Sequence, residues 1–230
     1  MKTRQLSIIA TILTCATLSL FFMNATFSPQ AKAPGEKVDR HTRVSHAREL
    51  LGSSYKKGAA HLYDKNPVYT KDILQTVRAN LPGTHKKYSY GVTRAILRES
   101  KKHGLDPVFV LALIQTESKW NPTAIGDAGE IGLMQIRPQT AKWTARHFKM
   151  TWNGASSLKN PLVNVTLGIA YISMLRHQMG ENSMKYLPAY NMGATAVRRL
   201  LAQNIQPMEY RQRVLANYEL IYRDIASAGL

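Results

Sequence analysis

Cysteine is almost missing from this sequence of 230 residues, in which Cys15 is the only one. A single cysteine excludes an intramolecular disulfide, a zinc site built from thiolates and a Cys-x-x-Cys redox centre. The seven histidines show neither His-Glu-x-x-His spacing nor a helical pair suited to zinc. The sequence also has no Gly-x-Ser-x-Gly motif, phosphate-binding glycine loop or dinucleotide fingerprint. We therefore expect no metal and no cofactor.

Acidic residues are scarce as well. The chain has 14 Asp and Glu against 31 Lys and Arg, and its formal net charge is +17. Such an excess predicts an anionic partner, for which nucleic acid is the usual candidate. The alternative is a solvated basic surface that has no dedicated ligand.

A long apolar run occurs only near the N-terminus, where basic residues precede an apolar stretch at residues 6–23. This order is typical of a secretory signal, and the stretch is close to the minimum for spanning a bilayer. We interpret residues 1–33 as a signal peptide or an uncleaved signal anchor, because the small-x-small site at 31–33 is followed by Pro34. Either interpretation exports the body to the periplasm or cell envelope, where a wall polymer or an anionic membrane surface is a better partner than nucleic acid.

Strand signals are almost missing too, and no internal repeat is visible. Helical periodicity begins near Thr42 and again near Ile73, so residues 34–85 are expected to form a linker and a short helical preface. Every long segment of residues 86–230 also has helical spacing. We therefore expect an all-α protein in which the preface precedes one larger helical domain.

Two helices of this larger domain share a start signal, an N-cap residue followed by proline, at Asp106-Pro107 and Asn160-Pro161. The first continues into an apolar run at residues 108–114, which predicts a helix buried on all sides. Residues 210–225, beginning at Tyr210, repeat apolar side chains at steps of three and four. This spacing predicts a C-terminal helix with a stripe packed against the core.

Glu117 lies at the end of the buried helix. Apolar surroundings penalise an ionised carboxylate, and so does the negative end of the helix dipole, so we expect its pKa to be raised. A carboxyl group that keeps its proton near neutral pH is what general-acid cleavage of a glycosidic bond requires. From position alone, a solvated glutamate on the last turn of a core helix is the commoner case.

A loop with three glycines within seven residues follows the glutamate, and such a loop lets the backbone approach a ligand closely. Four ordered blocks are present, namely Glu117-Ser118, Asn121-Pro122, Gly129-Glu130-Ile131-Gly132-Leu133-Met134-Gln135 and Ala189-Tyr190-Asn191-Met192-Gly193. In order and spacing they resemble the lytic transglycosylase family of the soluble type, within the lysozyme-like superfamily. The resemblance covers about residues 91–222.

The resemblance implies a lysozyme-like helical fold of the goose-lysozyme and transglycosylase type, with residues 86–230 as the catalytic domain. It implies a groove for peptidoglycan glycan strands and cleavage of the β-1,4 bond between MurNAc and GlcNAc, with a 1,6-anhydro-muramyl product. Glu117 would be the single acid and base, and Tyr190 would hydrogen-bond Glu117 or the reacting sugar. The residues implied to bind substrate are Ser118, Gly132, Met134, Gln135 and Asn191. Core roles for Tyr190 and Met134, and a bond from Ser118 to its own helix end, are the alternatives.

The sequence departs from the family at Gly126, where many members have a serine nine residues after the acid. Asp127 beside it is a candidate second carboxylate, which would let water compete and give lysozyme-like hydrolysis of the same bond. Glu130, inside the glycine-rich segment, is expected to brace the loop or lie on the surface.

Two further functions stay open. One is a non-catalytic wall-binding component of a secretion apparatus, against which the intact Glu117, Gln135 and Tyr190 argue. The other is a basic binder of nucleic acid or membrane surfaces, which salt dependence would identify. The residues also leave open secretion or wall-remodelling partners, a membrane anchor through residues 6–23, the oligomeric state and endo or exo cutting. The preface could brace the domain, cover the groove or dock a partner.

Overall fold

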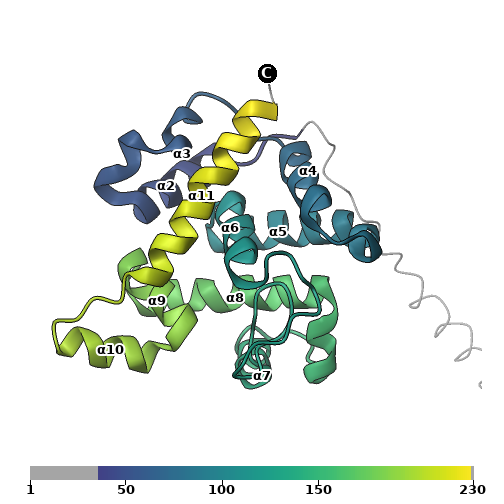
Figure 1. Cartoon of the computed structure of the whole chain (residues 1–230), viewed down its shortest axis with the longest axis vertical. Helices are drawn as coiled ribbons and strands as arrows, with labels where there is room; N and C mark the ends of the chain where they lie inside the picture. The colour runs from purple at the N-terminus through teal and green to yellow at the C-terminus, as the bar shows by residue number, and fades with distance from the viewer. Residues whose placement is uncertain (1–35, 229–230) are drawn as a thin grey trace, which may run out of the picture. The chain divides into compact units, whose positions relative to one another are not determined.

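The computed structural model describes residues 36–228, in which the regular elements are helices and no β-strand occurs. The expected all-α class is confirmed (Figure 1). Residues 36–228 all belong to one compact unit. The interpretation of residues 1–33 as a signal falls outside the described residues. None of the helices within residues 36–228 has the length and apolarity that crossing a membrane requires.

The helices of this unit follow one another with short connections. The α-helices are α2 (Arg40–Leu51), α3 (Ala59–Leu62), α4 (Thr70–Asn80), α5 (Ser89–His103), α6 (Pro107–Ser118), α7 (Pro138–His147), α8 (Pro161–Gln178), α9 (Ser183–Met192), α10 (Ala194–Ala202) and α11 (Glu209–Ala228). Short 3₁₀ helices lie at η1 (Gly52–Lys57), η2 (Gly83–Tyr88) and η3 (Ala155–Lys159). The longest segment among them without a helix is the loop between α6 and α7.

Both start signals act as the sequence predicts. The Asp106 carboxylate accepts a hydrogen bond from the Val108 N–H at 2.9 Å, and the Asn160 side chain accepts one from the Leu162 N–H at 2.9 Å. Each side chain therefore satisfies a backbone donor that the first turn of its helix leaves free. The following prolines take the first helical position, where no N–H is needed.

Helix α6 lies at the centre of the unit, and α11 crosses it (Figure 1). Every residue from Val108 to Ile114 is fully buried, as the unbroken apolar run predicts. Helices α5 and α8 pack on one another, and α5 also packs on α6. A central helix with no exposed face has a fixed position, so the residues at its two ends are fixed as well.

The preface packs on this same core through α2. The N–H of Asp106 donates to Nδ1 of His46 at 3.0 Å, and Nη1 of Arg43 donates to the Tyr222 hydroxyl at 3.3 Å. His46 and Arg43 are both buried. With Nδ1 of His46 accepting, Nε2 is the protonated nitrogen, and it lies 3.3 Å from the Tyr186 hydroxyl.

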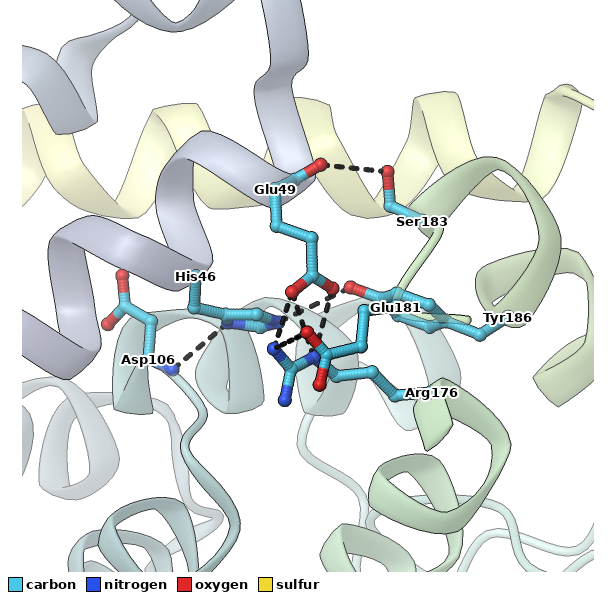
Figure 2. A network of polar contacts seen from close by, with 7 residues as sticks. All are labelled: His46, Glu49, Asp106, Arg176, Glu181, Ser183 and Tyr186. Carbon is cyan, nitrogen blue, oxygen red and sulfur yellow. Dashed lines mark hydrogen bonds and ion pairs between the residues drawn. The ribbon is translucent and has the colours of Figure 1, made fainter. Parts of the chain in front are cut away.

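An ion pair joins α2 to α8 (Figure 2). Nε of Arg176 donates to both carboxylate oxygens of Glu49, at 3.0 and 2.9 Å, and Glu181 lies 3.3 Å from the same guanidinium. The Ser183 hydroxyl at the start of α9 donates to the Leu50 carbonyl at 3.2 Å. Of the three roles open for the preface, the structure therefore shows the bracing one, because α2 holds the ends of three helices in place.

Candidate active site

The chain turns sharply just after Glu117. Lys119 and Trp120 both have left-handed backbone, with φ of +48° and +66°, and the Trp120 side chain is buried. Neither residue is glycine, so this conformation carries strain that the packing of the indole ring offsets. Helix α6 therefore ends at Ser118, and Glu117 is held on its last turn.

The Glu117 carboxyl is half-buried, and the Tyr210 hydroxyl of α11 donates a hydrogen bond to its Oε1. Burial raises the pKa of Glu117 to about 7, because an ionised carboxylate loses hydration there. The Tyr210 hydrogen bond and the Arg213 charge oppose this shift, and the Glu130 charge adds to it. The raised pKa expected from the sequence is confirmed, with burial as its largest cause.

Glu117 faces a cavity of about 400 Å³ that lies between the α6–α7 loop and α9. Its polar and aromatic lining suits a hydroxyl-rich ligand better than an apolar one. The lining residues are Glu117, Asp127, Ala128, Glu130, Gln135, Ile136, Arg137, Thr140, Tyr171, Tyr190, Asn191, Met192 and Gly193. Within residues 36–228, no group of three or more His, Cys, Asp or Glu side chains is arranged to hold a metal ion.

The Glu130 carboxylate braces the loop that forms one wall of this cavity. Its two oxygens accept from the Ala128 N–H at 3.0 Å and from Nε of Arg137 at 2.7 Å. A Cβ atom on Gly126 would lie 2.6 Å from Glu130 Oε2. The bracing role expected for Glu130 is confirmed, and its carboxylate occupies the space that a serine side chain at position 126 would need.

Asn164 of α8 holds the same loop through two hydrogen bonds. Its Oδ1 accepts from the Met134 N–H at 2.8 Å, and its Nδ2 donates to the Ile131 carbonyl at 2.7 Å. Gly132 has φ +79°, and a Cβ there would lie 2.4 Å from the Asn164 amide. Only glycine allows this close approach.

Three of the expected substrate-binding residues lie away from the cavity lining. Gly132 contacts Asn164 as described, and Met134 is fully buried against Gly168 of α8. Ser118 donates to the Leu133 carbonyl at 2.8 Å and so ties the helix end to the loop. Met134 therefore has the core position that was its alternative, and Ser118 also donates to the Ile114 carbonyl of its own helix end at 3.3 Å, which was the alternative for that residue.

Gln135 and Asn191 do line the cavity, as expected. The Gln135 backbone has φ +43°, and its Nε2 donates to the Gly132 carbonyl at 2.9 Å. This bond orients the amide toward the loop. Asn191 is exposed at the end of α9. Asp127 is also exposed and lines the cavity.

Tyr190 lines the cavity, but its hydroxyl donates to the Met134 carbonyl at 2.8 Å. The hydroxyl that contacts Glu117 belongs to Tyr210 instead, a residue for which the sequence predicted only a core position. A signal for it was present, because a buried tyrosine needs a partner for its hydroxyl where phenylalanine would not. Tyr210, Tyr218 and Tyr222 are three such tyrosines on one helix.

Known proteins share sequence and fold with this chain. The family model described as "Transglycosylase SLT domain" matches residues 94–211, just over half of the chain. Soluble lytic murein transglycosylase of Salmonella typhimurium is 32% identical over 108 residues, which are 46% of this chain and 17% of that protein. Endo-type membrane-bound lytic murein transglycosylase A of Klebsiella pneumoniae is 34% identical over 113 residues, 45% of this chain and 55% of that protein. The chain spans less than two thirds of the length of these relatives.

Solved structures show the same fold. An inactive mutant of lytic transglycosylase Slt from Pseudomonas aeruginosa has a TM-score of 0.52 and 22% identity, covering 86% of this chain and 39% of that one. The 70 kDa soluble lytic transglycosylase of Escherichia coli also has a TM-score of 0.52 and 22% identity, over 81% of this chain and 30% of that one. The matched family segment begins in α5 and contains Glu117, Tyr190 and Tyr210. From the family model, the ordered motifs and the shared fold, the chain belongs to the transglycosylase SLT domain family.

Proposed function

We propose that this protein is an exported lytic transglycosylase of peptidoglycan, with Glu117 as its single acid and base. The observation that carries the proposal is a carboxyl group with a pKa of about 7 on the wall of a polar cavity. Such a group holds a proton at neutral pH and is basic enough to take one back. The relatives named lytic murein transglycosylases support the substrate class.

In the proposed reaction, protonated Glu117 gives its proton to the oxygen that links MurNAc to GlcNAc, and the bond from C1 to that oxygen breaks. The C6 hydroxyl of the same muramyl ring then closes on C1 and gives its proton to the Glu117 carboxylate. A 1,6-anhydro ring forms, the carboxyl is regenerated and no water is consumed. This cycle needs one carboxyl group, whereas ordinary glycosidases need two.

The chain's other residues support this cycle in distinct ways. The Tyr210 hydroxyl orients Glu117 and stabilises its ionised form between the two proton transfers. Tyr190 and its neighbour Tyr171, whose rings lie 5.3 Å apart, form an aromatic wall of the cavity. Gln135 and Asn191 offer amide groups for the hydroxyl and N-acetyl groups of the glycan.

A second candidate is hydrolysis of the same bond with help from Asp127. The observation that favours it is the position of Asp127 on the lining of the cavity that holds Glu117. A carboxylate there would activate water, and the product would have a reducing end in place of the anhydro ring.

The test is mass spectrometry of the fragments that the full chain releases from purified peptidoglycan, beside Glu117→Gln. Anhydro-muramyl ends that vanish in Glu117→Gln are expected. Glu181→Gln is the matched control, since it removes an exposed carboxylate that does not line the cavity. Reducing ends that depend on both Glu117 and Asp127 would support the hydrolase, and no release at all would favour a wall-binding component.

A further inference from the structure

Helix α7 continues one wall of the cavity outward along a single stripe. Thr140 lines the cavity, and Trp143 and His147 follow it at steps of three and four residues, which places all three on one side of the helix. The buried side is a different one, formed by Ala141, Thr144 and Ala145. Because a helical side chain leans toward the N-terminus of its helix, Trp143 leans toward Thr140 and the cavity.

The rings of this stripe are held in place by one another. Trp143 is 47% exposed, and its ring is stacked on the His147 ring at a centroid distance of 5.5 Å and an angle of 12°. His147 meets Phe148 edge to face at 4.8 Å, and Phe148 in turn meets His103 of α5 at 5.4 Å. An exposed tryptophan that is supported in this way presents a flat surface whose orientation is already set. Less conformational freedom is lost when a ligand binds to such a surface.

The surroundings of Trp143 are polar and charged. Its neighbours Lys142 and Arg146 are exposed, whereas the centre of a protein interface is depleted of charged residues, lysine in particular. A flat aromatic ring within a polar surface suits a ligand that has both an apolar face and hydroxyl groups. A pyranose ring has this character, because its C–H groups form a weakly positive face that complements the negative face of an indole.

We propose that Trp143, supported by His147, is a binding platform for a sugar ring of the glycan strand that extends beyond the cavity. The proposal rests on the proposed function and adds a site that only longer substrates reach. It makes the affinity for glycans depend on chain length.

The experiment measures binding of β-1,4-linked N-acetylglucosamine oligomers, a disaccharide and a hexasaccharide, by calorimetry in the full chain carrying Glu117→Gln, which prevents turnover. Adding Trp143→Ala is expected to weaken hexasaccharide binding about three- to tenfold and to leave disaccharide binding unchanged. Trp143→Phe, which keeps an aromatic face, is expected to recover most of the loss. Tyr90→Ala is the matched control, because Tyr90 is an aromatic residue of similar exposure that does not line the cavity.

Fluorescence gives a second readout. Trp120 is buried and Trp152 is partly buried, so the acrylamide quenching that disappears in Trp143→Ala reports on the exposed Trp143, and the hexasaccharide is expected to protect this ring. Equal hexasaccharide affinity in the Trp143→Ala and Tyr90→Ala proteins would overturn the platform. If Glu117-dependent cleavage of peptidoglycan persists in that case, the proposed function stands without it. A chain that binds neither oligomer and releases no fragments would overturn both.

Discussion

Helix α6 has a carboxyl group at each end, and the two have different surroundings. Asp106, at the N-terminal end, is fully buried and accepts from the Val108 N–H at 2.9 Å and from the Tyr218 and Tyr222 hydroxyls at 2.6 Å each. Glu117, at the C-terminal end, is half-buried at a cavity. The Tyr210 hydroxyl donates a hydrogen bond to the Glu117 carboxyl group.

The contrast shows how one helix supports two uses of the same chemical group. Burial raises the pKa of both carboxyl groups, but three hydrogen bonds and the Arg43 charge oppose that shift at Asp106. The helix dipole favours a negative charge at the N-terminal end and disfavours it at the C-terminal end. Asp106 is therefore a structural carboxylate, while Glu117 is left able to exchange a proton at neutral pH.

The largest expected effect is on activity, at Glu117. Glu117→Gln keeps the shape and a hydrogen-bond acceptor for Tyr210 but removes the exchangeable proton. We expect release of glycan fragments to fall about a thousandfold or more, since general acid–base catalysis is lost. Fragment release from purified peptidoglycan measures this. A thermal midpoint at neutral pH at or above that of the unmodified chain is the control for folding, and unchanged release would exclude Glu117 as the acid.

Asp106 is expected to show the reverse pattern, with a large loss of stability. Asp106→Ala removes the N-cap of α6 and leaves two buried tyrosine hydroxyls without their acceptor. We expect the free energy of unfolding to fall by about 3 to 5 kcal/mol. Asp106→Asn keeps an N-cap oxygen and is expected to lose about 1 to 2 kcal/mol. Urea denaturation measures both, and the folded fraction is expected to retain its cleavage rate.

This pair also shows how far the sequence leads. Asp106-Pro107 predicts the start of α6, and the apolar run after it predicts the burial that raises the pKa of Glu117. Both are local signals, and the structure confirms them. The four family motifs add the proposal that Glu117 is the acid, because their order along the chain is visible without any knowledge of contacts.

What the sequence could not supply are contacts between residues far apart in the chain. Tyr210 reaches Glu117 across 93 positions, and Tyr222 reaches Asp106 across 116. A stripe of apolar residues predicts that such tyrosines are buried, but the direction in which α11 crosses α6 decides which carboxyl each hydroxyl meets. The bracing role of the preface was out of reach for the same reason, since it depends on His46 and Arg43 meeting helices much later in the chain.

A smaller effect is expected in the pH dependence of stability. The pKa of Glu117 is about 7 in the folded chain against 4.5 for an unperturbed glutamate. Between these values the folded state holds a proton that the unfolded state has released, so stability falls as pH rises from about 4.5 to about 7. Relative to Glu117→Gln, the unmodified chain is expected to lose about 1 to 3 kcal/mol across this window and nothing more above it.

Urea denaturation of the two proteins at matched pH values measures that difference. Glu181→Gln, which alters an exposed carboxylate, serves as the control, and its stability is expected to change with pH in parallel with that of the unmodified chain. A difference that stays constant between pH 4.5 and pH 7 would mean that Glu117 titrates at its ordinary pKa in the folded chain. The comparison of the two ends of α6 would then rest on hydrogen bonds alone.

The smallest effect, and the sharpest test of the comparison, comes from single hydroxyl groups on α11. The Tyr210 hydrogen bond lowers the pKa of Glu117, so Tyr210→Phe is expected to raise that pKa and to move the high-pH limb of the activity profile upward. The rate at neutral pH is expected to fall about three- to tenfold, because the carboxylate formed between the two proton transfers loses its donor. Tyr218→Phe removes a hydroxyl that serves Asp106 instead, and is expected to cost about 1 kcal/mol of stability with no movement of the limb. If both variants moved the limb equally, the two carboxyl groups would be coupled through α11, and the division between a structural end and a chemical end of α6 would fail.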